Sequence, residues 1–249
     1  MKTLWMILLL LAPAFAHAQT DSLASAVYPW NSEKPIISGS TLDLTTLYAY
    51  TVTLAANKTW KAPAQEQALE KLVIVKSGNM HLQAGQASQT IGPRSLALVI
   101  AGDAYSCKNT GKEPLTFYVL NYQTKIPGNI QRGRDAGGSL IKEWNTLPVT
   151  TSDKGAYRPL FDRPSGLFPR FDIHATQLNP GYASHPAHTH RVEEIILLIK
   201  GKVQMQTGDT FHDASAGDIV FLEANVPHAA KNLSSEPAEY YAIQWHVTP

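Results

Sequence analysis

Short apolar or alternating segments, separated by Gly, Pro, Asn and Asp, follow one another along most of the chain. Their short length and their β-branched and aromatic residues predict strands, and no long stretch shows helical periodicity. We expect strands over 45–54, 71–76, 95–100, 115–122, 171–178, 194–200, 218–222 and 240–247. Closely spaced turns between strands of this length predict an all-β fold of sandwiches or barrels.

The pattern recurs at an offset of 123 residues. Without any gap, Pro63, Gly78, Gly85, Lys108 and Asn109 meet identical residues at 186, 201, 208, 231 and 232. A repeat of this length predicts two units in place of one large domain. We place the first unit at 36–123 and the second at 170–249, after an N-terminal arm over 19–35. An ordered connector over 124–169 joins the two units.

Residues 1–18 have the features of a signal peptide. Lys2 precedes an apolar run over 4–11, and Ala16-His17-Ala18 fits a cleavage site of small residues. The run is short for a membrane span, and no later stretch approaches the required ~20 apolar residues. We therefore expect cleavage after Ala18, a periplasmic or secreted protein, and no membrane insertion of the mature chain.

The overall charge gives no sign of a polyanionic partner. The chain has 21 basic and 20 acidic side chains, and no dense basic stripe. Nucleic acid is therefore not an expected partner, whereas a small molecule is, and homo-oligomers are compatible with the sequence. Cys107 is the single cysteine, so no internal disulfide can form, and its apolar surroundings predict a buried thiol.

Four potential metal ligands lie in the second unit: His188, His190, Glu194 and His228. Even-numbered residues share one face of a strand, so the first three can point into one cavity, while Ile195 and its odd-numbered neighbours pack on the other side. Three imidazoles and one carboxylate suit one divalent ion, such as Mn, Fe, Ni, Co or Zn. Four protein ligands in an octahedral arrangement leave two positions open, as a catalytic metal requires.

The first unit has no such set, because the matching positions hold Gln65, Gln67, Lys71 and Tyr105. We expect a metal-free unit with a structural role, although a small-molecule pocket at its mouth stays open as an alternative. Glu193 and its counterpart Glu70 each precede the potential ligand position. We expect both to face away from the cavity, at the surface or between strands.

These segments resemble the two cupin motifs. His188, His190, Glu194 and Gly201 follow H-x-H-x3-E-x6-G, and His228 and Asn232 follow H-x3-N. Gly181 lies one residue too early, and the second motif lacks the glycine before its histidine, but neither departure affects a ligand. The resemblance implies two jelly-roll barrels, the first of them degenerate, and one metal site acting on a small substrate.

Further residues are candidates for the pocket around this site. His185 lies just before the motif and could act in acid–base chemistry or gating. The pairs His174 with Thr176, and Gln244 with His246, each share a strand face that could line the pocket. The leading hypothesis is a metal-dependent enzyme acting on a carboxylic acid, ureide, flavonol or sugar derivative. The alternative is a non-catalytic module that binds a small molecule.

Overall fold

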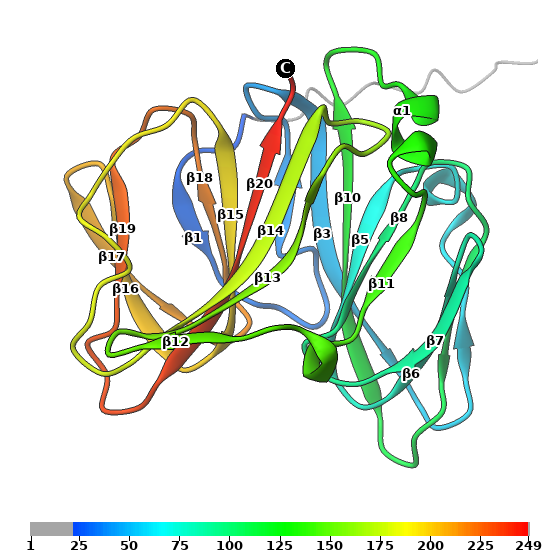
Figure 1. Ribbon diagram of the computed structural model, residues 1–249, viewed down its shortest axis with the longest axis horizontal. Helices are drawn as coiled ribbons and strands as arrows, with labels where there is room; N and C mark the ends of the chain where they lie inside the picture. Colours follow the sequence, from blue (N-terminus) through cyan, green and yellow to red (C-terminus); the bar gives the residue numbers. More distant parts are fainter. Residues whose placement is uncertain (1–21, 249) are drawn as a thin grey trace, which may run out of the picture.

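The computed structural model describes residues 22–248, so the predicted signal peptide lies outside the described residues (Figure 1). Within this range, strands make up nearly all of the regular structure, which confirms the prediction of an all-β fold. No helix in the range is long and apolar enough to cross a membrane.

The first half of the chain forms two antiparallel sheets, which we call the first barrel. The larger has six strands, in the order β11 (Leu140–Lys142), β8 (Leu96–Val99), β5 (Lys71–Ser77), β10 (Leu115–Thr124), β3 (Leu44–Leu54) and β2 (Ile37–Gly39). The smaller has four, in the order β4 (Thr59–Trp60), β9 (Tyr105–Asn109), β6 (Met80–Ala84) and β7 (Ala87–Ile91). A 3-10 turn, η1 (Ala64–Glu66), precedes β5.

The second half forms a matching pair of sheets, the second barrel. Its larger sheet has seven strands, in the order β1 (Ala26–Tyr28), β18 (Ile219–Leu222), β15 (Glu193–Lys200), β20 (Ala238–His246), β14 (Arg170–Leu178), β13 (Gly155–Arg163) and β12 (Thr150–Ser152). The smaller has three, in the order β17 (Thr210–Ser215), β16 (Lys202–Thr207) and β19 (His228–Lys231). A short helix, α1 (Ile130–Asp135), and a 3-10 turn, η2 (Trp144–Thr146), lie between the barrels in the sequence.

The two barrels correspond strand by strand at the offset of 123 residues. β8 maps onto β18 without any difference in bounds, and β5, β6, β7, β9 and β10 map onto β15, β16, β17, β19 and β20 within two residues at each end. The loop details agree as well. Gly78 and its counterpart Gly201 both have positive φ, and Asn109 and Asn232 are both fully buried and donate to two carbonyls each.

The central strands of the large sheets are buried on both faces. In β15, Ile195 and Leu197 pack in the core between the barrels, whereas Ile196 and Leu198 pack inside the second barrel. This explains why the segment is a continuous apolar run, since neither face meets water. The expected packing of the odd-numbered residues opposite the cavity is therefore confirmed.

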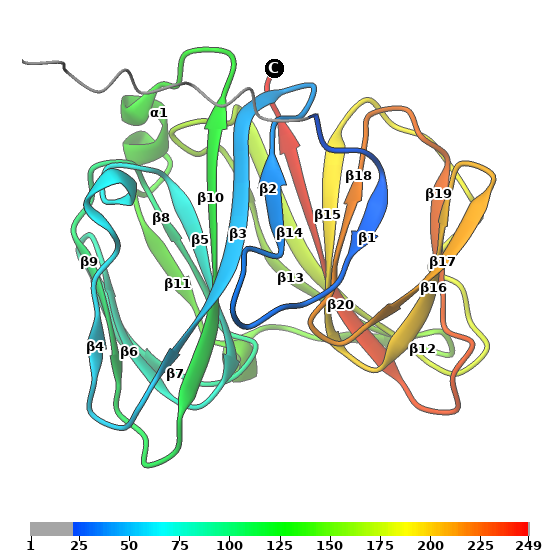
Figure 2. The ribbon, with the colours of Figure 1, turned by 180° about the vertical axis from the view of Figure 1, so that it is seen from behind.

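The two large sheets lie side by side in the middle of the molecule, and the small sheets lie outside them (Figures 1 and 2). One apolar core fills the space between the large sheets, with residues from both barrels, among them Leu72, Leu120, Phe171, Ile195 and Trp245. A core shared in this way makes each barrel a support for the other.

Glu70 and Glu193 face away from the cavity, as expected, but they are buried between the barrels and not at the surface. Glu193 accepts hydrogen bonds from Thr41 Oγ1 at 2.6 Å and from the backbone N–H of Leu42 at 2.9 Å, which precede β3 of the first barrel. Glu70 accepts one from the Gly166 N–H at 2.8 Å, just before β14 of the second barrel. Each barrel thus uses the same position to hold a loop of the other.

The arm and the connector both add strands to the barrels. β1, from the arm, pairs with β18 of the second barrel, and β11, from the connector, pairs with β8 of the first. β12 and β13, also from the connector region, extend the large sheet of the second barrel beside β14. The hairpin of β12 and β13 therefore reaches the mouth of the second barrel.

Candidate metal centre and its pocket

The four predicted ligands converge at one end of the second barrel. Glu194 is the second residue of β15, and His228 is the first of β19. His188 and His190 lie in the loop before β15, not on one strand, so the expected face-sharing is not what brings them together. A two-residue backbone bridge does so: the N–H of His188 donates to the carbonyl of His228 at 3.3 Å, and the reverse bond is 3.1 Å.

Backbone carbonyls fix the orientation of two imidazoles. His190 Nδ1 donates to the carbonyl of Val192 at 2.7 Å, and His228 Nδ1 donates to that of Val226 at 2.8 Å. Because a carbonyl only accepts, the proton lies on Nδ1, and Nε2 keeps its lone pair. Both Nε2 atoms are buried without a hydrogen-bond partner. This is the arrangement of histidines that bind a metal through Nε2.

Glu194 faces both of these nitrogens. Its Oε2 lies 3.4 Å from Nε2 of His190 and 3.4 Å from Nε2 of His228, which is an ion-pair distance that is long for a hydrogen bond. Burial raises the pKa of Glu194, but hydrogen bonds and positive charge from His190 and His228 in their protonated forms outweigh it and hold the pKa at about 2. The carboxyl is therefore ionised at neutral pH, as a ligand must be.

His185 lies against His188 at the rim. The two Nδ1 atoms are 2.9 Å apart, and the rings meet edge to face, with centroids 4.1 Å apart. Burial, followed by the charges of the neighbouring imidazoles, lowers the pKa of His188. Among the described residues, His188, His190 and His228 form the group of ligand atoms close enough to hold an ion, all within 4.8 Å of one another.

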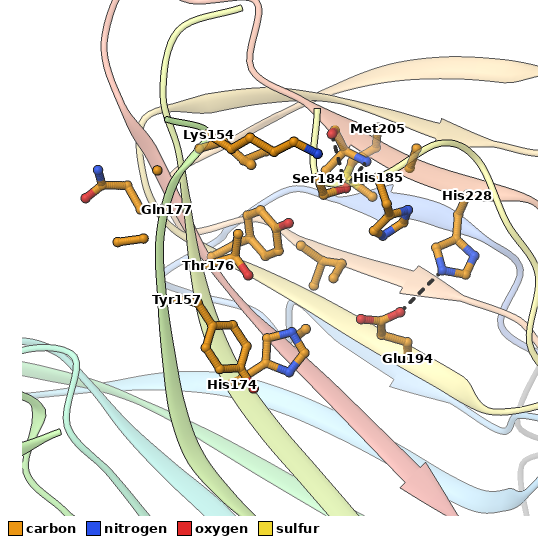
Figure 3. A pocket seen from close by; sticks show the side chains of 18 of the residues that line it. Lys154, Tyr157, His174, Thr176, Gln177, Ser184, His185, Glu194, Met205 and His228 are labelled. Carbon is orange, nitrogen blue, oxygen red and sulfur yellow. Dashed lines mark hydrogen bonds and ion pairs between the residues drawn. The ribbon is translucent and has the colours of Figure 1, made fainter. Parts of the chain in front are cut away.

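A pocket of about 400 Å³ opens beside the four residues. Figure 3 shows side chains that reach it from β13, β14 and the loop before β15. The predicted residues His174, Thr176 and Gln244 all line it, as do His185, His188, Glu194 and His228. His190 is not among the lining residues.

His246 does not line this pocket, although the strand alternation placed it on the same face as Gln244. It lies at the far end of β20, opposite Arg170, beyond the cavity. Sequence reasoning also missed Lys154, Tyr157, Ser184 and Tyr240, which line the pocket. Lys154 and Tyr157 belong to the hairpin of β12 and β13, and neither lies in a motif that could have indicated them.

The equivalent place in the first barrel is filled by the chain itself. Lys71, at the position of Glu194, is fully buried; its Nζ donates to Tyr105 Oη at 3.0 Å and to the Glu66 carbonyl. The Glu66 carboxylate accepts from Tyr50 Oη at 2.6 Å and from Asn121 Nδ2 at 2.9 Å. Burial lowers the pKa of Lys71 to about 8. An ammonium group at this place excludes a metal cation.

The side chains of the second barrel, in contrast, fit a divalent transition metal. They offer three imidazoles and one ionised carboxylate, and two buried nitrogens have no other partner. A donor set of nitrogen and carboxylate oxygen suits Mn, Fe, Co, Ni or Zn. The fold and the side chains together define a two-barrel β protein with one candidate metal centre.

Comparison with known proteins agrees with this class. Residues 175–244 match the cupin domain model, and no curated protein sequence matches the chain. Among solved structures, a putative glyoxylate-induced protein from Pseudomonas aeruginosa has a TM-score of 0.69 at 16% identity, covering 96% of this chain and 95% of that one. Oxalate decarboxylase from Lactobacillus farciminis, solved as a formate complex, has a TM-score of 0.63 at 13% identity, with 83% and 78% covered.

A further similar structure is the oxalate decarboxylase of Bacillus subtilis, whose Mn(II) centres were studied. Its TM-score is 0.62 at 12% identity, and the match covers 84% of this chain and 70% of that one. The match to the cupin domain model lies in the second barrel. At these identities the structural likeness shows the fold, not the reaction.

Proposed function

We propose that this cupin is an enzyme that uses one divalent transition metal, held by His188, His190, Glu194 and His228, to convert a small organic substrate. The observation that carries the proposal is the pair of buried Nε2 atoms, on His190 and His228, that face Glu194 and have no hydrogen-bond partner. Buried polar atoms without a partner are costly, and a bound cation would satisfy both.

A metal held by these four residues would supply Lewis-acid polarisation of a substrate oxygen. The chain's own residues supply the rest. Val192 and Val226 hold two imidazoles in the ligating tautomer through their carbonyls. Thr176 and Gln244 offer hydrogen bonds from the pocket wall, and Ile196 and Leu222 keep part of that wall apolar.

We assign His185 a role at the rim of the same site. His188 can bind a metal through Nε2 only with its proton on Nδ1, and that proton then points at His185 Nδ1, 2.9 Å away. His185 is half-buried and lines the pocket, so it can also exchange a proton with solvent or substrate.

We further propose that the first barrel, over 36–123, is a degenerate cupin unit formed by internal duplication, with a structural role. The strand correspondence at the offset of 123 residues and the matching pair Glu70 and Glu193 support this. We also propose export after cleavage of residues 1–18. N-terminal sequencing of the mature protein from its source tests this and is expected to begin at Gln19.

Metal analysis of protein purified without added metal tests the central proposal. We expect about one equivalent per chain, because such centres bind metal tightly. His190→Ala should lose this metal, since it removes one of the two buried Nε2 atoms that have no hydrogen-bond partner. Gln67→Ala, at the matching position of the first barrel, is the control and should keep it.

Three outcomes would contradict the proposal. A wild-type protein that takes up no transition metal on titration has no metal centre. Two equivalents per chain would mean that the first barrel also binds metal, despite Lys71. A fully loaded protein that binds small organic molecules but converts none of them would support the non-catalytic module.

A further inference from the structure

The lining of the second-barrel pocket carries one basic and one acidic side chain besides its histidines. Lys154 is the one lysine or arginine among the lining residues, and Glu194 is the one carboxylate. Glu194 is already engaged with His190 and His228. Lys154 forms no ion pair with any residue of the described range 22–248, so its charge is free to meet a ligand.

The backbone that carries Lys154 is fixed at the pocket mouth. Its carbonyl accepts a hydrogen bond from the Asn179 N–H at 2.8 Å, and Asn179 Nδ2 donates to the carbonyl of Asp153 at 3.0 Å. The next residue, Gly155, has φ of +141°, and a Cβ there would lie 1.9 Å from the carbonyl oxygen of Gln177. The turn is thus docked closely on the end of β14, and only glycine allows this approach.

From this turn the Lys154 side chain extends over the pocket, toward the side where Ser184 and His185 lie (Figure 3). The wall also carries neutral hydrogen-bonding groups. Burial raises the pKa of Tyr240 to about 12, so its phenol stays protonated and remains a donor at neutral pH. Gln244 lies opposite Glu194 on the neighbouring strand, and its amide has no hydrogen-bond partner among the described residues.

We infer that the pocket takes a small organic acid, and that Lys154 binds its carboxylate at the mouth. The inference rests on the proposed function in taking this pocket as the substrate site. A lysine, a neutral phenol and a free amide are donors that match a carboxylate and the oxygens next to it. The only carboxylate of the lining, Glu194, is turned toward His190 and His228.

Titration with malonate, and with malonamide as its neutral counterpart, tests the inference. Binding is measured by calorimetry on wild type, Lys154→Met and Lys154→Arg, with Lys200→Met as a control at an exposed lysine outside the pocket. We expect malonate to bind wild type about tenfold or more tightly than Lys154→Met, as for the loss of one charge-assisted contact. Lys154→Arg should keep most of the affinity, and Lys200→Met all of it.

The metal content of every variant is measured first and is expected to be equal, since Lys154 is not a proposed ligand. The titrations are repeated after chelation, so that the Lys154 contribution is measured whether or not a metal is present. An absent metal with Lys154-dependent malonate binding would refute the proposed function alone. Equal malonate affinity in wild type and Lys154→Met, tighter binding of malonamide, or no malonate binding would overturn the inference.

Discussion

Glu70 gives the stability of the protein a pH dependence that can be calculated. The carboxyl is 1% exposed, and burial raises its pKa to about 7 despite hydrogen bonds from Ser165, Gly166 and Tyr122. The ordinary pKa of a glutamate side chain is 4.5. The folded protein thus holds a proton on Glu70 at pH values where the unfolded chain has released it.

The sign follows from this difference. Between pH 4.5 and 7 the folded state binds more protons than the unfolded state, so the free energy of unfolding falls as the pH rises. Since one pKa unit is worth about 1.4 kcal/mol, the contribution of Glu70 is fully present below pH 4.5, and about 3 kcal/mol of it is lost above pH 7.

Glu70→Gln should remove this dependence. The amide is a neutral mimic of the protonated acid, and its oxygen can still accept from Gly166. We expect the stability of wild type relative to the variant to fall by about 3 kcal/mol from pH 4.5 to pH 8. Urea unfolding followed by tryptophan fluorescence, with metal chelated throughout, measures the difference at each pH.

Glu113→Gln, at an exposed glutamate, is the control and should leave the pH dependence unchanged. Because the stability of wild type and that of the variant are compared at the same pH, the contributions of all other titrating groups cancel to first order. A difference between wild type and Glu70→Gln that stays constant from pH 4.5 to 8 would refute the reasoning, because it would mean that Glu70 is ionised in the folded state throughout.

Two further predictions concern Lys71, inside the first barrel, and His185, at the rim of the second. The stability of Lys71→Met relative to wild type should be greatest below pH 8 and should fall as the pH rises to 10.5, because the Lys71 ammonium loses its proton at a lower pH in the folded state than in the unfolded state. Urea unfolding over this pH range measures the difference in stability, and a constant difference would contradict the prediction. His185→Ala should weaken metal binding about 10- to 100-fold through the orientation of His188, as measured by competition with a chelator. His212→Ala, an exposed histidine of β17, is its control, and equal affinities for the two variants would exclude this role.

The strands could be predicted because their alternation is a local property. Each of the eight expected strands is present within two residues of its predicted bounds. The ligand set was also visible, since its spacing is a property of the sequence. The reason why these residues converge could not be predicted, because His188 and His190 lie in a loop that is fixed by a backbone bridge to His228. That contact joins residues 40 positions apart.

Contacts between distant parts of the chain account for the other differences. The loops held by Glu70 and Glu193 lie 96 and 151 residues away from them, at Gly166 and Leu42. Nothing in the local pattern around either glutamate indicates such a partner. Lys154 is a similar case, because the connector had to fold back as a hairpin before its charge could reach the pocket.

The adjacent pairs Glu70-Lys71 and Glu193-Glu194 show how the charge of one residue differs between the two barrels. In both pairs the first side chain points between the barrels and the second points into its own barrel, as strand alternation requires. Inside the first barrel, the chain itself provides both charges, because the Lys71 ammonium interacts electrostatically with the Glu66 carboxylate. Inside the second, Glu194 faces imidazole lone pairs, and the chain provides no fixed cation. This missing positive charge, together with the three histidines, supports the proposal of a metal ion in the second barrel.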